Sequence, residues 1–271
     1  MTQEIRTRIV GIVNLTPDSF SDGGKYVGAE AAIAHMEQLV EDGADVLDIG
    51  AESTRPGARA LSHDEEWERL APVVQVAKAR FPLTPISIDT RNAATASKAL
   101  DNGVDWINDV SGGGDGQMLE VIRGSACRYV VMHSLSVPAS PKKVLPNNVD
   151  ATITVQSWAE RRLQMLYDAG IATERVILDP GIGFGKTAEQ SWNLLRGVPT
   201  LMELPVPLLI GHSRKSFFKA VGERHAAERD METHLVTCWL AQCGVPYIRV
   251  HDVAGTKRAL AVGMQLRKGE R

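Results

Sequence analysis

The chain has 271 residues, of which 44% are hydrophobic and 23% charged, an ordinary composition for a globular protein. A net charge of −3 argues against a surface built for nucleic acid or for an anionic membrane. The sequence shows no signal peptide, no apolar run of membrane-span length and no CxxC pair among its three cysteines, which together predict a reduced, cytoplasmic compartment.

Short apolar runs alternate with helical patterns along the whole chain. Each run is nearly continuous in apolar residues, as expected for a strand buried on both faces of a parallel sheet. The predicted strands lie, in chain order, at residues 8–14, 44–50, 85–90, 105–110, 128–133, 175–180, 207–213 and 247–253.

Helical patterns fill the intervals between these runs. The clearest cover residues 29–42, 92–102 and 151–169, and each is followed or ended by glycine, the usual C-terminal signal of a helix. Eight strand–helix units without a shift in composition predict one domain over residues 1–271, folded as a (β/α)₈ TIM barrel. An open, doubly wound sheet is the structural alternative.

Two long connections follow the first two predicted strands, at residues 14–28 and 51–63. Both lie at the carboxyl end of a strand, where barrel enzymes build their active sites. Loops of this length inside a compact domain are usually functional or disordered. A third long connection, residues 134–150 after the fifth strand, has the pattern of a surface excursion.

Polar side chains stand at or just after the end of every predicted strand, so that in a barrel they would meet at one mouth. One subset consists of Asp89, Asn108 and Asp179, with Lys215 after the seventh strand. Two carboxylates and an amide suit a neutral heterocycle that offers several N–H donors. Lys215 would then meet a carbonyl or nitrogen of the ring.

A second subset comes from the neighbouring eighth, first and second strands: Asn14, Arg55, Arg249 and His251. It is mostly cationic and suits a phosphate or diphosphate. Asn14 offers an oxygen ligand to Mg²⁺, which typically takes one or two protein oxygens and completes its shell with water and phosphate.

Two glycine-containing motifs follow the sixth and seventh strands. "GHSRKSF" predicts a strand-to-helix turn in which Ser213 is the N-cap, at a helix end that would attract a carboxylate. "DPGIGFGK" is neither GxGxxG nor a Walker A loop, and its alternating glycines favour a tight turn that approaches a flat ring closely. Phe184 within it would wall that pocket or pack in the core.

Histidines at the ends of three strands, His133, His212 and His251, raise the alternative of a barrel hydrolase with catalytic zinc. The first strand carries no His-x-His, and the chain contains no HExxH. Both absences weigh against that alternative.

Taken together, the strand-end motifs resemble dihydropteroate synthase over essentially the whole chain. The matching stretches are "GIVNLTPDSFSDGG", "DIGAESTRPGA", "ISIDT", "INDVSGG", "VMHS", "ILDPGIGFGKT", "GHSRKSF" and "RVHDV". The resemblance implies a (β/α)₈ barrel, usually a homodimer, with no nucleic-acid or membrane partner. It also implies an Mg²⁺-dependent transferase that joins 4-aminobenzoate to 6-hydroxymethyl-7,8-dihydropterin diphosphate in folate synthesis and releases pyrophosphate.

The resemblance further implies roles for individual residues. Asn14 matches the family's magnesium-linked asparagine. The positions that match the pterin pocket are Asp89, Asn108, Met132, Asp179 and Lys215. The positions that match the diphosphate ligands are Arg55, Arg249 and His251. Other substrate-binding positions are matched by Thr54, Phe20, Pro56, Phe184 and Ser213, the last four around the 4-aminobenzoate. The residues expected to act in catalysis are Arg55, Lys215, Arg249 and His251, and no catalytic base is expected.

One departure from the family pattern follows "VMH", where the family commonly continues with Met or Asn and a glycine. This chain continues with "SLSVPAS", which puts the loop after the fifth strand in doubt. Two alternatives stay open. One is a pterin-binding methyltransferase domain of the same barrel superfamily, and the other is a non-catalytic paralogue.

Overall fold

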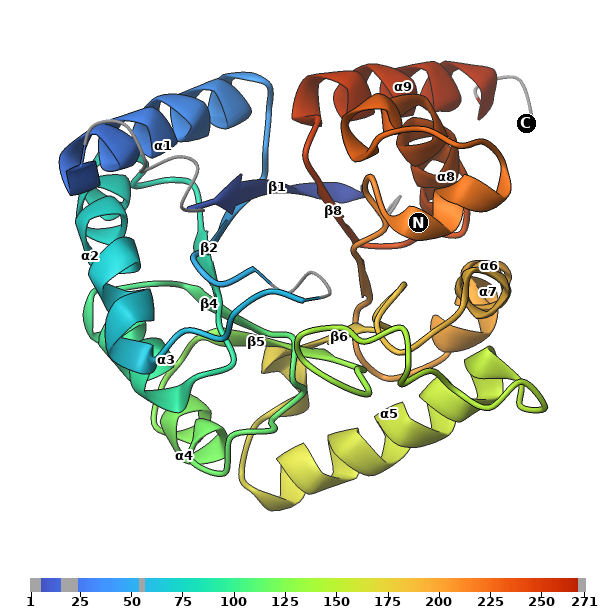
Figure 1. Ribbon diagram of the computed structural model, residues 1–271, viewed down its shortest axis with the longest axis horizontal. Coiled ribbons are helices and arrows are strands. Elements are labelled where there is room, and N and C mark those ends of the chain that lie inside the picture. The colour runs from blue at the N-terminus through green and yellow to red at the C-terminus, as the bar shows by residue number, and fades with distance from the viewer. Residues whose placement is uncertain (1–5, 16–23, 54–56, 268–271) are drawn as a thin grey trace, which may run out of the picture.

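Eight parallel strands form a ring at the centre of the molecule (Figure 1). The computed structural model describes residues 6–15, 24–53 and 57–267. The strand order is β6-β5-β4-β3-β2-β1-β8-β7, and a parallel bridge between Leu178 and Leu208 joins the two ends of that order. The sheet therefore closes into a barrel, and the open doubly wound alternative is wrong.

The first predicted strand is confirmed without change, and the others are confirmed with ends trimmed by one to three residues, except for the seventh. The observed bounds are β1 Arg8–Asn14, β2 Val46–Gly50, β3 Ile86–Asp89, β4 Trp106–Asp109, β5 Arg128–Met132, β6 Val176–Asp179, β7 Leu209–Ile210 and β8 Tyr247–Val250. Strand β7 is shorter than the predicted 207–213. Its chain leaves the ladder at Gly211, ahead of the turn that carries Ser213 and Lys215.

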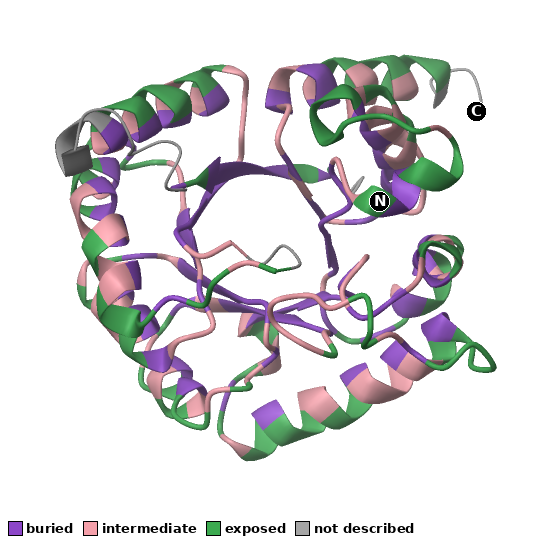
Figure 2. Cartoon of the chain, viewed as in Figure 1, coloured by how far each residue is buried: buried purple, intermediate pink, exposed green. Residues whose placement is uncertain are grey.

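Helices surround the ring and bury the side that faces it (Figure 2). Their bounds are α1 Gly24–Glu41, α2 His63–Arg80, α3 Ala93–Asp101, α4 Met118–Arg123, α5 Ala151–Asp168, α6 Ala188–Arg196, α7 Val198–Leu201, α8 Asp230–Gln242 and α9 Val253–Arg267. Short 3₁₀ helices lie at η2 Thr173–Arg175, η3 Ser216–Ala220 and η4 Ala226–Glu228. The helices expected at 92–102 and 151–169 are confirmed to within a residue. The one expected at 29–42 begins five residues earlier.

The inside of the barrel has two layers that follow from the two-residue period of a strand. The lower layer is apolar and consists of Val10, Val46, Trp106, Val130, Ile177, Leu209 and Tyr247. Two residues further along five of these strands, the same face presents Asp48, Asn108, Met132, Asp179 and Arg249. Polar side chains therefore gather above an apolar floor, at the carboxyl end of the barrel.

The apolar floor is held by aromatic contacts at the amino end of the barrel. The rings of Trp106 and Tyr247 meet edge to face with centroids 5.2 Å apart. Arg128 lies over the Trp106 ring and donates a 2.8 Å hydrogen bond to the Tyr247 hydroxyl. Buried Tyr hydroxyls usually need such a partner, and here the partner closes the lower end of the barrel.

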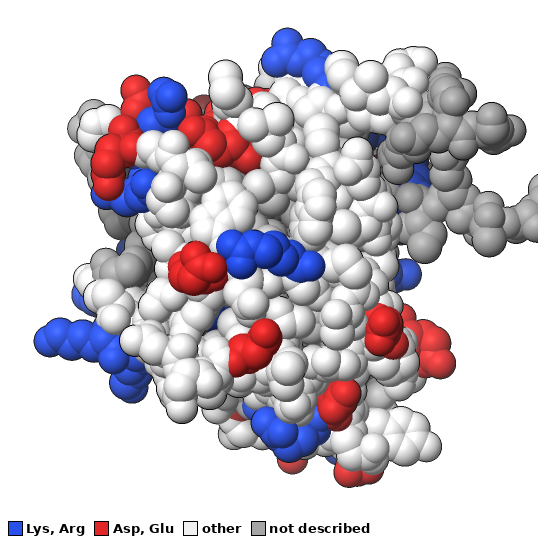
Figure 3. All heavy atoms as spheres, turned by 90° about the vertical axis from the view of Figure 1, so that its right-hand side faces the viewer, with Lys and Arg blue, Asp and Glu red and all other residues white. Residues whose placement is uncertain are grey.

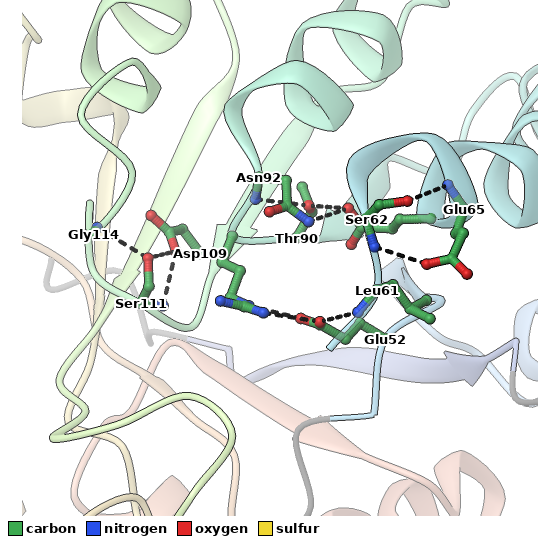
Figure 4. Close-up of polar contacts among 11 residues, drawn as sticks. Glu52, Leu61, Ser62, Glu65, Thr90, Asn92, Asp109, Ser111 and Gly114 are labelled. Atoms are coloured by element: carbon green, nitrogen blue, oxygen red, sulfur yellow. Dashed lines mark hydrogen bonds and ion pairs between the residues drawn. The ribbon is translucent and has the colours of Figure 1, made fainter. Parts of the chain in front are cut away.

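The loop after β4 is shaped by one fully buried carboxylate. Asp109 accepts hydrogen bonds from the Ser111 amide (2.8 Å), the Gly113 amide (2.7 Å) and the Tyr129 hydroxyl (2.7 Å). Ser111 in turn accepts from the Gly114 amide, as Figure 4 shows. Asp109 ends β4, but its acceptor capacity is spent on the protein itself.

The outer face of α8 and α9 is apolar. Exposed side chains repeat every four residues along each helix, at Met231 and Leu235 on α8 and at Val262 and Leu266 on α9. The side of the molecule that carries these helices, on the right in Figure 1, is largely uncharged, with Lys, Arg, Asp and Glu side chains scattered over it (Figure 3). Within the described part of the chain, no helix has the length and apolarity needed to cross a membrane.

Candidate functional site

The centre of the barrel mouth is a buried network around Arg249. Its Nε donates to Asp48 Oδ2 at 2.5 Å and its Nη2 donates to Asp89 Oδ2 at 2.9 Å. Asn108 Nδ2 donates to the same Asp48 oxygen at 3.0 Å. Four side chains from β2, β3, β4 and β8 are thus joined by charge-assisted hydrogen bonds.

The sequence analysis missed Asp48 and placed Arg249 in a separate, diphosphate-binding subset. Asp48 lies in the middle of a strand, not at its end, and is only 1% exposed. The signal was present, because an ionised residue inside the buried run "DVLDIG" needs a partner. The structure brings Arg249 into contact with Asp89 of the first subset, so this residue joins the two subsets.

A second cluster lies between β6 and the loop after β7. Asp179 is buried, and its Oδ1 accepts a 2.7 Å hydrogen bond from the Gly181 amide. Lys215 Nζ donates to the Ile182 carbonyl at 2.5 Å and lies 4.7 Å from the centroid of the Phe184 ring. Phe184 therefore flanks a site lysine, which supports its predicted place in the pocket wall.

Burial shifts the pKa values of the central groups toward their neutral forms. It raises the pKa of Asp89 to about 7, although the charge of Arg249 opposes the shift. It also raises the pKa of Asp179, against the opposing charge of Lys215. Burial lowers the pKa of Lys215 to about 8, with Asp179 opposing. Near neutral pH, small changes in these surroundings therefore change the charge of the site.

The loop from Asp179 to Lys186 is tied together from within. A side chain at Gly181 (φ 69°) would place its Cβ 1.9 Å from the His133 carbonyl oxygen, so only glycine fits. The buried Lys186 ammonium donates to the carbonyls of Gly181 (2.9 Å) and Phe184 (3.0 Å) and contacts His133 Nδ1 at 2.7 Å. The sequence analysis did not predict that Lys186 would hold this loop together by hydrogen bonds to its carbonyl groups.

The connection at residues 134–150, expected as a surface excursion, packs against this same loop. The Leu145 amide donates to the Gly185 carbonyl at 2.9 Å, and Gln190 Nε2 donates to the Leu145 and Pro146 carbonyls. Leu145 is itself buried. The segment otherwise runs over the surface as expected, since Leu145 is its one buried residue, and these contacts anchor it to the neighbouring loop.

Ser213 does not cap a helix, contrary to the prediction. The helix after β7 is the short η3, its N-cap is Lys215, and that residue makes no side-chain capping bond. Ser213 Oγ lies instead 2.9 Å from His251 Nδ1 and accepts from the His251 amide at 3.3 Å. Ser213 and His251, from the loops after β7 and β8, are thereby brought together.

Met132 and Asn14 occupy the strand ends where they were expected. Met132 ends β5 and is 3% exposed, on the same inward face as the polar layer. Asn14 ends β1, pairs with Gly50 of β2 and is exposed. Phe20, Asp22, Thr54, Arg55 and Pro56 lie outside the described residues.

The loop after β2 is anchored close to its start. Both Glu52 oxygens accept from the Arg91 guanidinium, at 2.8 and 3.0 Å, and Oε1 also accepts from the Leu61 amide at 2.9 Å (Figure 4). Ser62 and Glu65 then begin α2 with a capping box. One carboxylate therefore joins residues 52 and 61 to the loop that follows β3.

The three histidines do not come together as a metal site. The His212 ring is buried against the Thr233 carbonyl and the Thr237 hydroxyl, both 3.0 Å from Nε2, and burial lowers its pKa to about 4. His133 contacts Lys186 and His251 contacts Ser213. Over residues 6–15, 24–53 and 57–267, no group of three or more His, Cys, Asp or Glu side chains is placed to hold a metal ion. The zinc hydrolase alternative has no support here.

Sequence comparison links this arrangement to known proteins. The family described as pterin binding enzyme matches residues 10–251. Dihydropteroate synthase of Neisseria meningitidis serogroup C is 42% identical over 270 residues, which cover 96% of this chain and 94% of that protein. The folate synthesis bifunctional protein of Chlamydia caviae is 38% identical, and the chain spans 58% of its length.

Two solved structures share the fold closely. Dihydropteroate synthase from Anaplasma phagocytophilum with bound 6-hydroxymethylpterin-monophosphate superposes with a TM-score of 0.87 at 38% identity, covering 96% of this chain and 99% of that one. The Xanthomonas albilineans enzyme with 4-aminobenzoic acid gives a TM-score of 0.89 at 38% identity, covering 97% and 93%. The chain therefore belongs to the pterin binding enzyme family, among the dihydropteroate synthases.

Proposed function

We propose that this chain joins 4-aminobenzoate to 6-hydroxymethyl-7,8-dihydropterin diphosphate and releases 7,8-dihydropteroate and pyrophosphate. The observation that carries the proposal is the convergence of buried Asn108 and Asp179 with half-buried Asp89 and Lys215 at the mouth of the barrel. Buried carboxylates that accept hydrogen bonds suit the N–H groups of a pterin ring, and Lys215 suits a carbonyl or nitrogen on it. The relatives with a bound pterin and with 4-aminobenzoic acid support the same pair of substrates.

In the proposed reaction, the bond between the pterin methylene carbon and the diphosphate oxygen breaks, and its electron pair leaves with the diphosphate. The nitrogen of 4-aminobenzoate then gives its lone pair to the methylene carbon and releases a proton to water. A neutral aryl amine is nucleophilic without a base, so positioning and charge stabilisation supply the rate. Arg249 spends two of its five N–H donors on Asp48 and Asp89, and the remaining donors suit an oxygen of the diphosphate. We propose Arg55 and His251 as its companions.

The residues at the end of β1 fit Mg²⁺. Asn14 presents an exposed amide oxygen, and Mg²⁺ commonly uses one or two protein oxygens together with water and substrate phosphate. When bound, the ion would neutralise charge on the departing diphosphate. Asn14 would hold it, and the pterin carboxylates would stay available for the ring.

We place the 4-aminobenzoate beside the pterin, with Ser213 near its carboxylate and Phe184 against its ring. Phe20, Thr54 and Pro56 complete the proposed set of contacts. A cytoplasmic location accords with three cysteines that are all free thiols.

The decisive experiment is pyrophosphate release measured with both substrates and Mg²⁺. Release that depends on 4-aminobenzoate supports the proposal, and methyl transfer to a corrinoid or pterin binding without turnover would support the two alternatives.

Asp179→Asn should weaken binding of the free hydroxymethyl pterin by about 30- to 150-fold, or about 2–3 kcal/mol. The amide keeps one oxygen, which the Gly181 amide already occupies at 2.7 Å, and turns an N–H₂ group toward the ring donors. Calorimetry checks the affinity, and Asp101→Asn on the exposed end of α3 is the matched control. Unchanged affinity in a folded variant removes Asp179 from the pocket.

Arg249→Ala should weaken both the diphosphate substrate and the unphosphorylated pterin. Removing the guanidinium leaves the buried carboxylates of Asp48 and Asp89 without their cation, so Asp89 takes up a proton and loses an acceptor for the ring. Calorimetry with the two ligands separates the effects. A loss confined to the diphosphate compound would mean that Arg249 does not support the pterin subset.

The pH profile of kcat/KM for the pterin diphosphate should be bell-shaped, with its maximum between about 7 and 8. Below pH 7 the Asp89 carboxylate becomes protonated and can no longer accept two N–H groups, because its pKa is raised to about 7. Above pH 8 the Lys215 ammonium loses its charge, because its pKa is lowered to about 8. Lys215→Arg should remove the alkaline limb. A flat profile from pH 6 to 9 contradicts both assignments.

We also propose that two copies of the chain associate through the apolar face of α8 and α9. Its exposed residues are Met231, Leu235, Val262 and Leu266, and large exposed apolar patches usually mark an interface. Sedimentation velocity should give the mass of two 29.4 kDa chains, and Leu235→Glu should give the mass of one. A wild-type chain that stays single at all micromolar concentrations would rule out this pairing.

A further inference from the structure

Arg214 has a backbone conformation that is unusual for its residue type. Its φ is 58°, and among the described non-glycine residues it alone has a positive φ. This left-handed conformation is disfavoured for side chains with a Cβ and persists where surrounding contacts enforce it, often at functional sites. Arg214 stands between Ser213 and Lys215, two residues assigned to the substrates.

Contacts to three different parts of Arg214 enforce this conformation. Its amide donates to Thr233 Oγ1 at 3.1 Å, and its carbonyl accepts from Arg229 Nη1 at 3.0 Å. Its guanidinium donates to both oxygens of Asp230, at 2.7 Å each. The partners Arg229, Asp230 and Thr233 stand at the start of α8, and we call these three residues the α8 clamp.

The α8 clamp is itself tied together. Thr233 Oγ1 donates to the Arg229 carbonyl at 2.7 Å, and Thr233 and Arg229 are 1% and 6% exposed. Arg229 Nη2 also donates to the Arg224 carbonyl at 2.6 Å, so the clamp spans the loop between η3 and α8. A bidentate arginine–carboxylate pair adds directional specificity to this arrangement.

The conformation of Arg214 directs its neighbours. The Arg214 side chain turns toward α8, while Ser213 on one side contacts His251 and Lys215 on the other contacts Phe184 and the Ile182 carbonyl. The chain reverses direction at this residue and enters η3 directly afterwards. A relaxed right-handed or extended backbone at this position would redirect at least one of the two site residues.

We propose that the α8 clamp is a positioning device, which holds Arg214 in the left-handed conformation and thereby aims Ser213 and Lys215 at the two substrates. The inference rests on the proposed function for the identity of those substrates. Arg214, Asp230 and Thr233 are positioning residues and touch neither substrate. The α8 clamp thus links the barrel mouth to a helix of the outer layer.

The test compares two variants that lose the same ion pair. Arg214→Ala keeps the cost of the left-handed backbone, whereas Arg214→Gly adopts that backbone freely. We expect kcat/KM to fall in both and to be about tenfold lower in Arg214→Ala than in Arg214→Gly. Glu223→Gln, in the exposed Lys219–Glu223 pair of the same loop, is the control and should match the wild type.

A second pair of variants does not alter residue 214. Thr233→Val removes the hydroxyl that accepts from the Arg214 amide at nearly constant volume, and Thr233→Ser restores it. Thr233→Val should raise the KM for 4-aminobenzoate, weaken free pterin binding and move the imidazole NMR signals of His251, and Thr233→Ser should reverse all three. This pair keeps the proposal testable if a variant of Arg214 fails to fold.

Three outcomes would overturn the inference. Equal kcat/KM in Arg214→Ala and Arg214→Gly would show that the backbone conformation does not limit the reaction. A loss of 4-aminobenzoate affinity alone, equal in both, would mean that the guanidinium contacts the substrate. Wild-type behaviour of Thr233→Val would remove the clamp. If the wild type releases no pyrophosphate, the proposed function fails, while pterin affinity and the His251 signals still decide whether the clamp acts.

Discussion

The arrangement of the barrel mouth depends on one buried cation, the guanidinium of Arg249. It lies between the carboxylates of Asp48 and Asp89, and among residues 6–15, 24–53 and 57–267 it is the only cation paired with either of them. Breaking such a pair from one side is far more costly than its net contribution to stability suggests, because the remaining charge stays buried. The guanidinium therefore decides whether Asp89 is a carboxylate that can accept hydrogen bonds from a ligand. Asn108, which donates to the same oxygen of Asp48, takes its orientation from the same network.

The loops around this centre are stiffened by buried polar groups that bind the backbone of the chain itself. Asp109 organises the loop after β4, Lys186 the loop after β6, and Glu52 the start and end of the loop after β2. Each of these side chains has an acceptor or donor capacity that a ligand could have used. Because the protein spends it internally, these three side chains stiffen the loops that surround Asp89, Asp179 and Lys215 at the centre of the mouth. Preorganisation of this kind lowers the entropy cost of binding.

Much of the site could be predicted because alternate residues of each strand point into the barrel, so the spacing of residues in the sequence predicts which side chains meet there. Residues two apart on a strand share a face, so Trp106 in the floor fixes Asn108 in the polar layer, and Tyr247 likewise fixes Arg249. Asp48 obeys the same rule and lies in the same polar layer, but β2 continues past it to Gly50, so an analysis restricted to strand ends did not look there. This rule does not predict the roles of Lys186 and Arg214. Those roles depend on the conformation of loops and on which carbonyls or carboxylates the loops bring next to the two side chains. The capping role expected of Ser213 failed for the same reason, because the chain reverses at Arg214 before any helix begins.

The aromatic floor of the barrel determines from which end ligands can enter and leave the site. Trp106 and Tyr247, held by Arg128, lie in the lumen at the amino end of the strands, and the described residues around them form a buried apolar layer below Asp48 and Asn108. Every molecule that reaches the polar layer must therefore come and go through the carboxyl-end opening. In the proposed reaction two substrates and two products would share that opening, and a pterin held by Asn108 and Asp179 would lie deepest and would have to arrive first.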